Sequence, residues 1–310
     1  LKQRRSKFSR SQKSCCTGFV SDMDGIVTIL KPPGMTSSNV VFDVRKIFSE
    51  KRAGHLGTLD PAAAGVLPVC LGRATRLFDI LVDKDKEYVF EIALGTQTDT
   101  QDAYGTVIAR SDRAVTRDEL NEILPEFIGG QMQAASIYSA LKVDGKKMYD
   151  LARAGETIEP RLREICVHEL ELIEQTGPSR FLLRAVCSRG TYVRSLCESI
   201  AERLGTVGYV PVLLRTRSGP FISEQALTIS ELDAAKAAGT LYETLISCED
   251  AMAFLPELRL PQDRTTPTKN GLETHVRGAA DGLVRAYGDD VFLGVGEIKK
   301  ERFRLSIHLY

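Results

Sequence analysis

This sequence lacks the spacings of histidine, cysteine and glycine that are typical of metal and cofactor sites. The four histidines, at 55, 168, 275 and 308, lack the spacing of zinc ligands. The seven cysteines form no C-x-x-C pair, which argues against a zinc site and fits a reducing compartment. No glycine-rich phosphate loop, dinucleotide-binding fingerprint or G-x-S-x-G nucleophile elbow is present. We therefore expect neither a metal nor a cofactor.

Long apolar runs and a secretory leader are missing as well. No apolar run approaches the roughly 18 residues that a membrane-spanning helix needs. The N-terminus is basic but lacks the apolar stretch of a secretory signal. Hydrophobic residues make up 43% and charged residues 26% of the chain, which are ordinary values for a globular protein with a core. The sequence thus predicts a cytoplasmic protein with no membrane partner.

The 310-residue chain has no net charge, but its charges are unevenly placed. Residues 1–13 hold six basic and no acidic side chains, which leaves 35 basic against 41 acidic residues in the rest. A basic tail of this kind can bind nucleic acid. A disordered tail is the simpler interpretation of residues 1–22, and more fold-like sequence begins at Met23.

Hydrophobic periodicity predicts strands and helices that mix without a strict alternation, which is typical of an α+β fold. Residues 86–95, KEYVFEIALG, alternate like a half-buried strand. Thr116 and Glu119 form a capping box at a helix start, and Ser37, Ser38 or Asn39 can cap another helix. Further strands are predicted over residues 25–30, 65–72, 164–173, 181–188 and 209–214, and further helices over 73–83 and 190–205.

The sequence changes character between Pro256 and Pro261. Beyond them, residues 282–310 contain short apolar stretches separated by Gly and Asp turns, which predict a small β module. We therefore divide the chain into a basic tail (1–22), a larger domain (23–252) and a C-terminal β module (256–310).

Residues 52–61, RAGHLGTLDP, place one carboxylate in a glycine-rich loop. The run is too rich in glycine for a helix and too irregular for a strand. Asp60 before a proline is a common turn arrangement. Gly54, Gly57 and Gly65 permit backbone positions that are closed to other residues. Such a loop can hold a carboxylate at a set angle, as nucleophilic or general-base catalysis requires.

Five ordered motifs resemble those of the TruB family of tRNA pseudouridine synthases. The most specific is GHLGTLDPAAAGVLPVCLGRATRL, residues 54–77. The others are DGIVTILKPPGMTSSNVV (24–41), KEYVFEIALGTQTDTQDAYG (86–105), YSALKVDGKKMYDLARAG (138–155) and CSRGTYVRSL (187–196). The resemblance covers about residues 23–225. It implies the pseudouridine synthase fold, with a mixed, mainly antiparallel central sheet and a catalytic domain over 23–252.

The C-terminal β module has a weaker resemblance of its own. Its sequence is similar to the small PUA-like module with which many relatives hold tRNA. A plain stabilising β module is the alternative.

The resemblance also implies a reaction. A uridine, at position 55 in the T loop of tRNA, is isomerised to pseudouridine with no cofactor and no metal. The family's nucleophilic aspartate falls on Asp60, and attack on ribose C1′ and attack on base C6 both stay open. Arg194 would pair with Asp60 and keep it ionised. Tyr88 would stack on the target base, near the C5 proton that must leave.

Further positions match residues around the family's RNA site. His55 matches the histidine that fills the gap left by the everted uridine. Tyr192 and Leu213 match positions that line the uridine pocket, and Asp102 would belong to the charge network around Arg194. Because most of the chain is acidic overall, RNA must bind to a local basic groove. Candidates for that groove are Lys31, Arg73, Arg76, Lys142, Lys146, Lys147, Arg189, Arg215 and Arg217.

The sequence departs from the family pattern near these motifs. Ala135 and Ser136 stand where relatives usually carry Pro-Pro, and Leu214 stands where an arginine commonly precedes Arg215. The second change removes a phosphate contact, so we expect weaker tRNA binding. Two alternatives to a monomeric isomerase of the tRNA T arm stay open. One is an RNA-binding or tRNA-folding protein on the same scaffold, and the other is a synthase that acts on another RNA.

Overall fold

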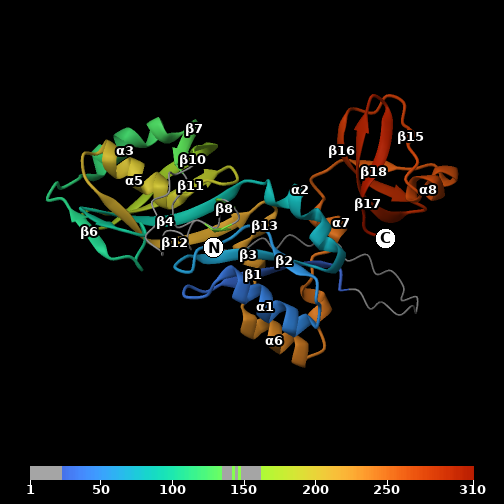
Figure 1. Cartoon of the computed structure of the whole chain (residues 1–310), viewed down its shortest axis with the longest axis horizontal. Helices are drawn as coiled ribbons and strands as arrows, with labels where there is room; N and C mark the ends of the chain where they lie inside the picture. Colours follow the sequence, from blue (N-terminus) through green and yellow to red (C-terminus); the bar gives the residue numbers. More distant parts are fainter. Residues whose placement is uncertain (1–22, 135–141, 144–145, 148–161) are drawn as a thin grey trace, which may run out of the picture.

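The computed structural model describes residues 23–134, 142–143, 146–147 and 162–310. Within these ranges a nine-stranded central sheet is flanked by helices, and a separate five-stranded sheet lies near the C-terminus (Figure 1). The α+β class expected from the sequence is confirmed.

The central sheet is mixed and mainly antiparallel, as expected. Its strands follow the order β1–β3–β12–β4–β11–β10–β7, with β2 paired to β3 and β13 paired to β12. The pairing of β12 with β3 is parallel, and the other pairings in the described part of this sheet are antiparallel. The strands are β1 Gly25–Lys31, β2 Ala53–His55, β3 Ala64–Leu71, β4 Lys86–Leu94, β7 Gly129–Ala134, β10 Leu162–Gly177, β11 Arg180–Cys187, β12 Gly208–Ser218 and β13 Phe221–Ile222.

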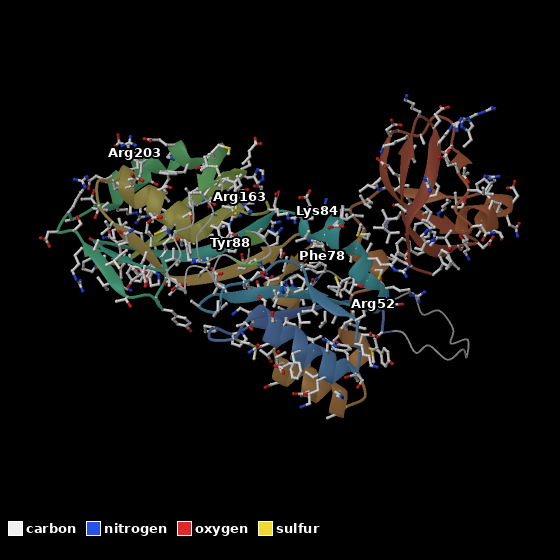
Figure 2. All side chains as sticks on the ribbon, viewed as in Figure 1. Arg52, Phe78, Lys84, Tyr88, Arg163 and Arg203 are labelled. Atoms are coloured by element: carbon white, nitrogen blue, oxygen red, sulfur yellow. The ribbon has the colours of Figure 1, made fainter. Side chains whose placement is uncertain are left out.

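Helices and short hairpins surround this sheet. The helices α1 and α6 pack on each other below β1, whereas α3 and α5 lie at the other end, beside β7 and β10 (Figure 1). Figure 2 shows Tyr88 on β4 and Phe78 on α2 near the middle of the molecule. The helical elements are α1 Ser37–Phe48, η1 Gly72–Leu77, α2 Phe78–Val82, α3 Arg117–Ile123, η2 Leu124–Phe127, α5 Val193–Arg203, η3 Ser223–Gln225, α6 Ile229–Ala237, η4 Leu241–Thr244 and α7 Cys248–Ala251. The hairpins are β5 Thr96–Thr98 with β6 Val107–Arg110, and β8 Lys142–Val143 with β9 Lys146–Lys147.

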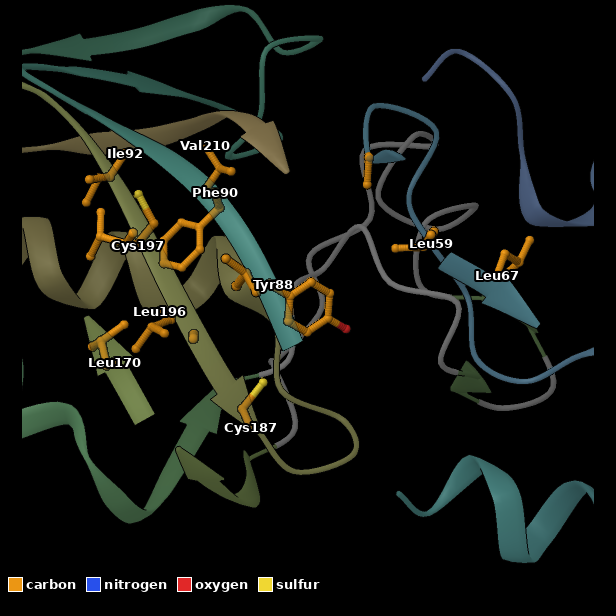
Figure 3. Close-up of a cluster of buried hydrophobic side chains, with 14 of the residues drawn as sticks. Leu59, Leu67, Tyr88, Phe90, Ile92, Leu170, Cys187, Leu196, Cys197 and Val210 are labelled. Atoms are coloured by element: carbon orange, nitrogen blue, oxygen red, sulfur yellow. The ribbon is translucent and has the colours of Figure 1, made fainter. Parts of the chain in front are cut away.

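The largest buried cluster follows the alternation of β4. Tyr88, Phe90 and Ile92 point to one face of the sheet, where Leu196 and Cys197 of α5 pack against them (Figure 3). The intervening residues of β4 are less buried, because successive strand residues point to opposite faces. The strand predicted over residues 86–95 is confirmed. Tyr88 lies near its first residue, on the face that packs against the buried cluster.

The C-terminal sheet has its own core. Its order is β14–β16–β17–β18–β15, with β14 Glu257–Arg259, β15 Thr274–His275, β16 Gly282–Gly288, β17 Val291–Lys299 and β18 Arg302–His308. The helix α8, Gln262–Lys269, packs beside β16 and β18. The short strands and Gly and Asp turns expected over residues 282–310 are confirmed.

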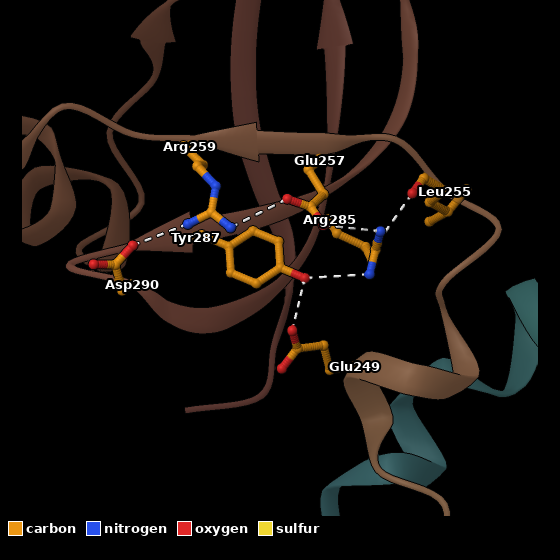
Figure 4. A network of polar contacts seen from close by, with 7 residues as sticks. All are labelled: Glu249, Leu255, Glu257, Arg259, Arg285, Tyr287 and Asp290. Atoms are coloured by element: carbon orange, nitrogen blue, oxygen red, sulfur yellow. Dashed lines mark hydrogen bonds and ion pairs between the residues drawn. The ribbon is translucent and has the colours of Figure 1, made fainter. Parts of the chain in front are cut away.

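A polar network joins the C-terminal sheet to α7 (Figure 4). The Tyr287 hydroxyl donates to Glu249 Oε1 at 3.0 Å, and Arg285 Nε donates to the Leu255 carbonyl at 3.0 Å. Burial and the Glu249 carboxylate raise the pKa of Tyr287 to about 12, so the phenol keeps its proton. The network therefore fixes where the second sheet attaches.

The structure differs from several local expectations. The N-cap of α1 is Thr36, whose side chain accepts from Asn39 N, and not a residue of 37–39. Residues 53–55, expected to be irregular, form β2, because pairing with β3 satisfies their backbone groups. Residues 73–83 begin with 3₁₀ geometry before α2. The capping box of Thr116 and Glu119 is confirmed. The YSALKVDGKKMYDLARAG motif predicts a hairpin turn that runs into a helix ending at Gly155, and that helix lies outside the described residues.

Candidate active site

A cavity of about 330 Å³ opens where the loop before β3, β4, β12 and the start of α5 meet. Six residues singled out in the sequence line it together: His55, Asp60, Tyr88, Tyr192, Arg194 and Leu213. They come from segments up to about 160 residues apart in the chain, and the order of strands in the sheet brings them together.

Asp60 and Arg194 form the central ion pair of this cavity. Arg194 Nη2 lies 2.8 Å from Asp60 Oδ2, and Arg194 Nη1 donates to the Thr100 carbonyl at 2.9 Å. The arginine side chain is only 4% exposed, whereas that of Asp60 is 30% exposed. The guanidinium is therefore fixed from behind while the carboxylate stays accessible from the cavity. An anchored, partly open carboxylate of this kind can act as a nucleophile.

The buried hydroxyl of Ser37 fixes the loop residue just before Asp60. Ser37 Oγ accepts from Leu59 N at 2.9 Å and donates to the Leu59 carbonyl at 3.0 Å. Both backbone groups of Leu59 are thus satisfied by one side chain from the first turn of α1. Ser37 was expected only as a possible helix cap, and no local pattern predicts this contact, because its partner lies 22 residues away.

Arg215 holds the same loop from the side of β12. Its side chain donates to three carbonyls, those of Val66 at 2.8 Å, Gly57 at 3.2 Å and Thr58 at 3.3 Å. The residue is 1% exposed. Its expected place in an exposed basic groove is wrong, because these contacts bury the guanidinium under the loop.

Lys31 was also expected in that groove, and it too is buried. Its ammonium donates to the carbonyls of Met35 at 2.7 Å, Pro32 at 2.9 Å and Pro61 at 3.4 Å. Burial lowers the pKa of Lys31 to about 8, and the nearby Asp60 carboxylate opposes that shift. Lys31 and Arg215 therefore fix the backbone on both sides of Asp60.

Two of the three glycines expected to permit unusual backbone angles adopt them. Gly57 has a φ of +98° and Gly65 a φ of +111°. A Cβ on Gly65 would lie 2.2 Å from the Arg215 carbonyl, so a side chain is excluded there. Gly54 does not use this freedom, since it has no such φ and no atom lies within 4 Å of an added Cβ.

Burial favours the neutral forms of two further side chains of the cavity, Tyr88 and His55. Tyr88 is 9% exposed, and burial raises the pKa of its phenol. Burial and the positive charge of Arg215 lower the pKa of His55. His55 Nδ1 is buried without a hydrogen-bond partner in the described part of the chain. A neutral imidazole and a neutral phenol can contact a flat base without a charge to desolvate.

Asp102 lies beside Arg194 in a small cavity that Asp60 also lines, and it is linked to the arginine through Thr100. Its Oδ1 accepts from Thr100 Oγ1 at 2.6 Å, and Arg194 binds the carbonyl of the same threonine. Asp102 therefore acts on the arginine through the loop that holds Thr100.

Lys86, the first residue of the strand predicted over 86–95, was not singled out in the sequence. It is 5% exposed and lines the cavity. Its ammonium donates to the Val82 carbonyl at 2.5 Å and to the Lys84 carbonyl. Burial, then the positive charges of Arg215 and Arg189, lower its pKa to about 8. Lys86 is in phase with Tyr88 and Phe90 on the buried face of β4, but this alternation does not predict the carbonyls that its ammonium meets.

The remaining basic candidates are spread over several surfaces. Arg189 lines the cavity. Arg73 is paired with Asp24, and Arg76 donates to the His308 carbonyl at 2.6 Å, both away from the cavity. The side chains of Lys142, Lys146 and Lys147, like Ala135 and Ser136, lie outside the described residues. Among the residues that are described, no group of three or more His, Cys, Asp or Glu side chains is arranged to hold a metal ion. No helix in these ranges is long and apolar enough to cross a membrane.

Comparisons with known proteins agree on one family. The N-terminal domain of the TruB family pseudouridylate synthases matches residues 45–193, and the tRNA pseudouridylate synthase B C-terminal domain matches residues 194–253. A tRNA pseudouridine synthase B of Pelotomaculum thermopropionicum is 42% identical over 91% of this chain and 93% of its own length. Another, of Caldanaerobacter subterraneus, is 40% identical over 91% of this chain and 98% of its own.

Solved structures show the same likeness in three dimensions. A chain in the structure of an H/ACA RNP bound to a substrate RNA containing 2′-deoxyuridine has a TM-score of 0.71 and 26% identity, covering 92% of this chain and 85% of its own. A chain of the archaeal box H/ACA sRNP Nop10–Cbf5 complex has a TM-score of 0.70 and 25% identity, over 92% and 86%. With the fold and the site, these matches place the protein in the class of pseudouridine synthases. Within that class, the chain belongs to the TruB family.

Proposed function

We propose that this protein isomerises uridine 55 in the T loop of tRNA to pseudouridine, as a monomer in the cytoplasm, through a covalent intermediate on Asp60. The observation that carries the proposal is the Arg194–Asp60 ion pair of 2.8 Å, with the carboxylate partly exposed in the cavity. Family membership and the relatives named tRNA pseudouridine synthase B support the choice of substrate.

The reaction needs one nucleophile and no redox partner. The bond between N1 of the base and C1′ of the ribose breaks, the base turns, and a bond from C5 to C1′ forms. C5 loses a proton and N1 gains one, so atoms and electrons balance without a second substrate. The Asp60 carboxylate forms a transient bond, at C1′ or at C6, which breaks again when the product is released. Arg194, 2.8 Å away, holds that carboxylate in a fixed direction.

The other cavity residues provide the walls for the everted nucleotide. We assign to Tyr88 stacking on the target base, since its neutral ring lies on the rigid strand β4. Tyr192 and Leu213 form further walls. His55, at the end of β2, is placed to fill the gap that an everted base leaves in the RNA stack.

The division of the chain into domains is part of the proposal. Residues 23–252 form the catalytic domain, and residues 256–310 form a PUA-like module that holds tRNA. The separate core of the C-terminal sheet supports this division. The hydrogen bond from Tyr287 to Glu249 supports a fixed angle between the two parts, which a long, rigid substrate such as tRNA requires.

An assay with an unmodified T-arm stem-loop tests the proposal. Wild-type protein should convert one uridine, and Asp60→Asn should abolish product while RNA affinity stays within about a factor of ten, because the substitution removes the nucleophile and little contact area. Asp233→Asn, an exposed carboxylate on α6, is the matched control and should behave as wild type. RNA binding by wild-type protein without product would instead identify an RNA-folding protein.

A further inference from the structure

We propose that the mouth of this cavity binds a second nucleotide, next to the target uridine in the RNA strand, with its base stacked on Phe78 and its phosphate on Arg189. The inference rests on the proposed function, because it needs an RNA strand whose target base enters the cavity. Phe78 and Arg189 both line the same cavity as Asp60.

Phe78 is an exposed aromatic side chain at a functional surface. It is the first residue of α2 and is 39% exposed. Val82, four residues later on the same side of the helix, also lines the cavity. Leu77 and Leu81 are buried in the hydrophobic cluster on the other side. Leu77 and Leu81 therefore supply the core contacts of this segment. The Phe78 ring is directed to the cavity and solvent instead.

The helix that carries Phe78 is held in place. The Lys86 ammonium donates to the carbonyls of Val82 and Lys84, at the end of α2. The same lysine begins β4, the strand of Tyr88. Figure 2 shows Phe78 and Tyr88 on these neighbouring elements. A fixed aromatic ring loses little conformational entropy when a base stacks on it.

The weak ion pair of Arg189 leaves its guanidinium able to bind a phosphate in place of its present partner. Its side chain is 51% exposed, and its ion-pair partner is Asp83, 3.8 Å away and 72% exposed. Such an exposed pair contributes little, because water screens both charges. Asp83 directly follows α2, so Arg189 lies beside the end of the helix that presents Phe78.

An aromatic face next to a weakly paired arginine is the combination that binds single-stranded nucleic acid. Bases of either kind stack on aromatic rings, and the backbone phosphate needs a cation within reach. The target base has its own walls in Tyr88, Tyr192 and Leu213. Phe78 is therefore available to stack on the base of a neighbouring nucleotide. Such a contact favours binding of RNA loops in which that neighbouring base is also unstacked.

The test combines protein variants with abasic RNA. Binding and single-turnover rates are measured for wild type, Phe78→Ala, Phe78→Trp and Phe42→Ala on T-arm stem-loops. One RNA is intact, and two others lack the base on the 5′ or the 3′ side of the target. Phe42 is a matched control, because it is 65% exposed on α1 and does not line the cavity.

We expect Phe78→Ala to weaken binding of the intact RNA by about tenfold, as loss of one base–aromatic stack does, with an unchanged rate at saturating RNA. Phe78→Trp should restore binding, and Phe42→Ala should match wild type. On one of the two abasic RNAs, Phe78→Ala and wild type should bind equally. Arg189→Gln should lower the slope of log affinity against log salt concentration by about one.

Equal binding of intact RNA by wild type and Phe78→Ala would overturn the inference. A defect of Phe78→Ala that persists on both abasic RNAs would also overturn it, because the lost contact would then not involve a neighbouring base. If wild type makes no product but the binding differences appear as expected, the proposed reaction fails and the second subsite stands.

Discussion

The hydroxyl of Ser37 offers a sharp test of how the loop before β3 positions Asp60. In Ser37→Ala the Leu59 N–H and C=O both lose this partner, and burial keeps water from replacing it, since Ser37 is 3% exposed and Leu59 is 3% exposed. The substitution removes one oxygen atom and leaves the fold of α1 otherwise unchanged.

The expected cost follows from the two stranded backbone groups. Each buried, unsatisfied donor or acceptor costs about 1–3 kcal/mol, so the two groups together set an upper range of about 2–6 kcal/mol for the loss in free energy of unfolding in Ser37→Ala. The loop can relieve part of this cost by moving towards water. Such a movement displaces Asp60, and a displacement of about 1 Å can slow a reaction about a hundredfold.

Urea unfolding and single-turnover kinetics on the stem-loop measure both effects. Ser37→Ala should show the loss of stability and a slower rate at saturating RNA, with unchanged RNA affinity. Ser38→Ala is the matched control, because Ser38 is exposed on the same helix turn. If Ser37→Ala is as stable and as active as Ser38→Ala, the assignment of Ser37 as the residue that fixes Leu59 is refuted.

Three more predictions follow from the same contacts. Arg194→Lys should slow turnover about a hundredfold at constant RNA affinity, because one ammonium cannot hold both Asp60 and the Thr100 carbonyl in the guanidinium geometry; wild-type turnover would contradict this. Gly65→Ala should lower the free energy of unfolding by more than about 3 kcal/mol, judged by urea midpoint, whereas Gly54→Ala should stay near wild type. The pKa of Lys86 falls from 10.5 in the unfolded chain to about 8 in the folded protein, so between these pH values the unfolded chain holds the proton. The stability of wild type relative to Lys86→Met should therefore rise by about 1–3 kcal/mol from pH 8 to 10, and a flat difference would contradict the lowered pKa.

Local periodicity predicted most of the elements around the site. The alternation in β4 correctly indicated that Tyr88 faces the core, and the apolar stripe of residues 190–205 correctly indicated α5. These patterns depend on neighbours within a few residues, so a single sequence contains them. Motif resemblance then named Asp60 and Arg194, and the structure brings them to 2.8 Å.

Three buried polar residues could not be predicted in the same way. Lys31 and Arg215 were expected in an exposed basic groove, and Lys86 was not singled out, because charged residues are usually exposed. Each is buried because its donors meet backbone carbonyls, and for Arg215 these belong to residues about 150 positions earlier in the chain. A charged residue that fills such a carbonyl cage has no periodicity of its own, so only the packed fold reveals it.

The carbonyl cage around Arg215 has a consequence for biosynthesis. The peptide that carries Asp60 leaves the ribosome long before Arg215 does, and until β12 inserts between β3 and β4 the reactive carboxylate has no fixed direction. Catalytic competence therefore arrives only after β12 has been made and inserted, so a nascent chain that lacks this strand cannot act on RNA prematurely.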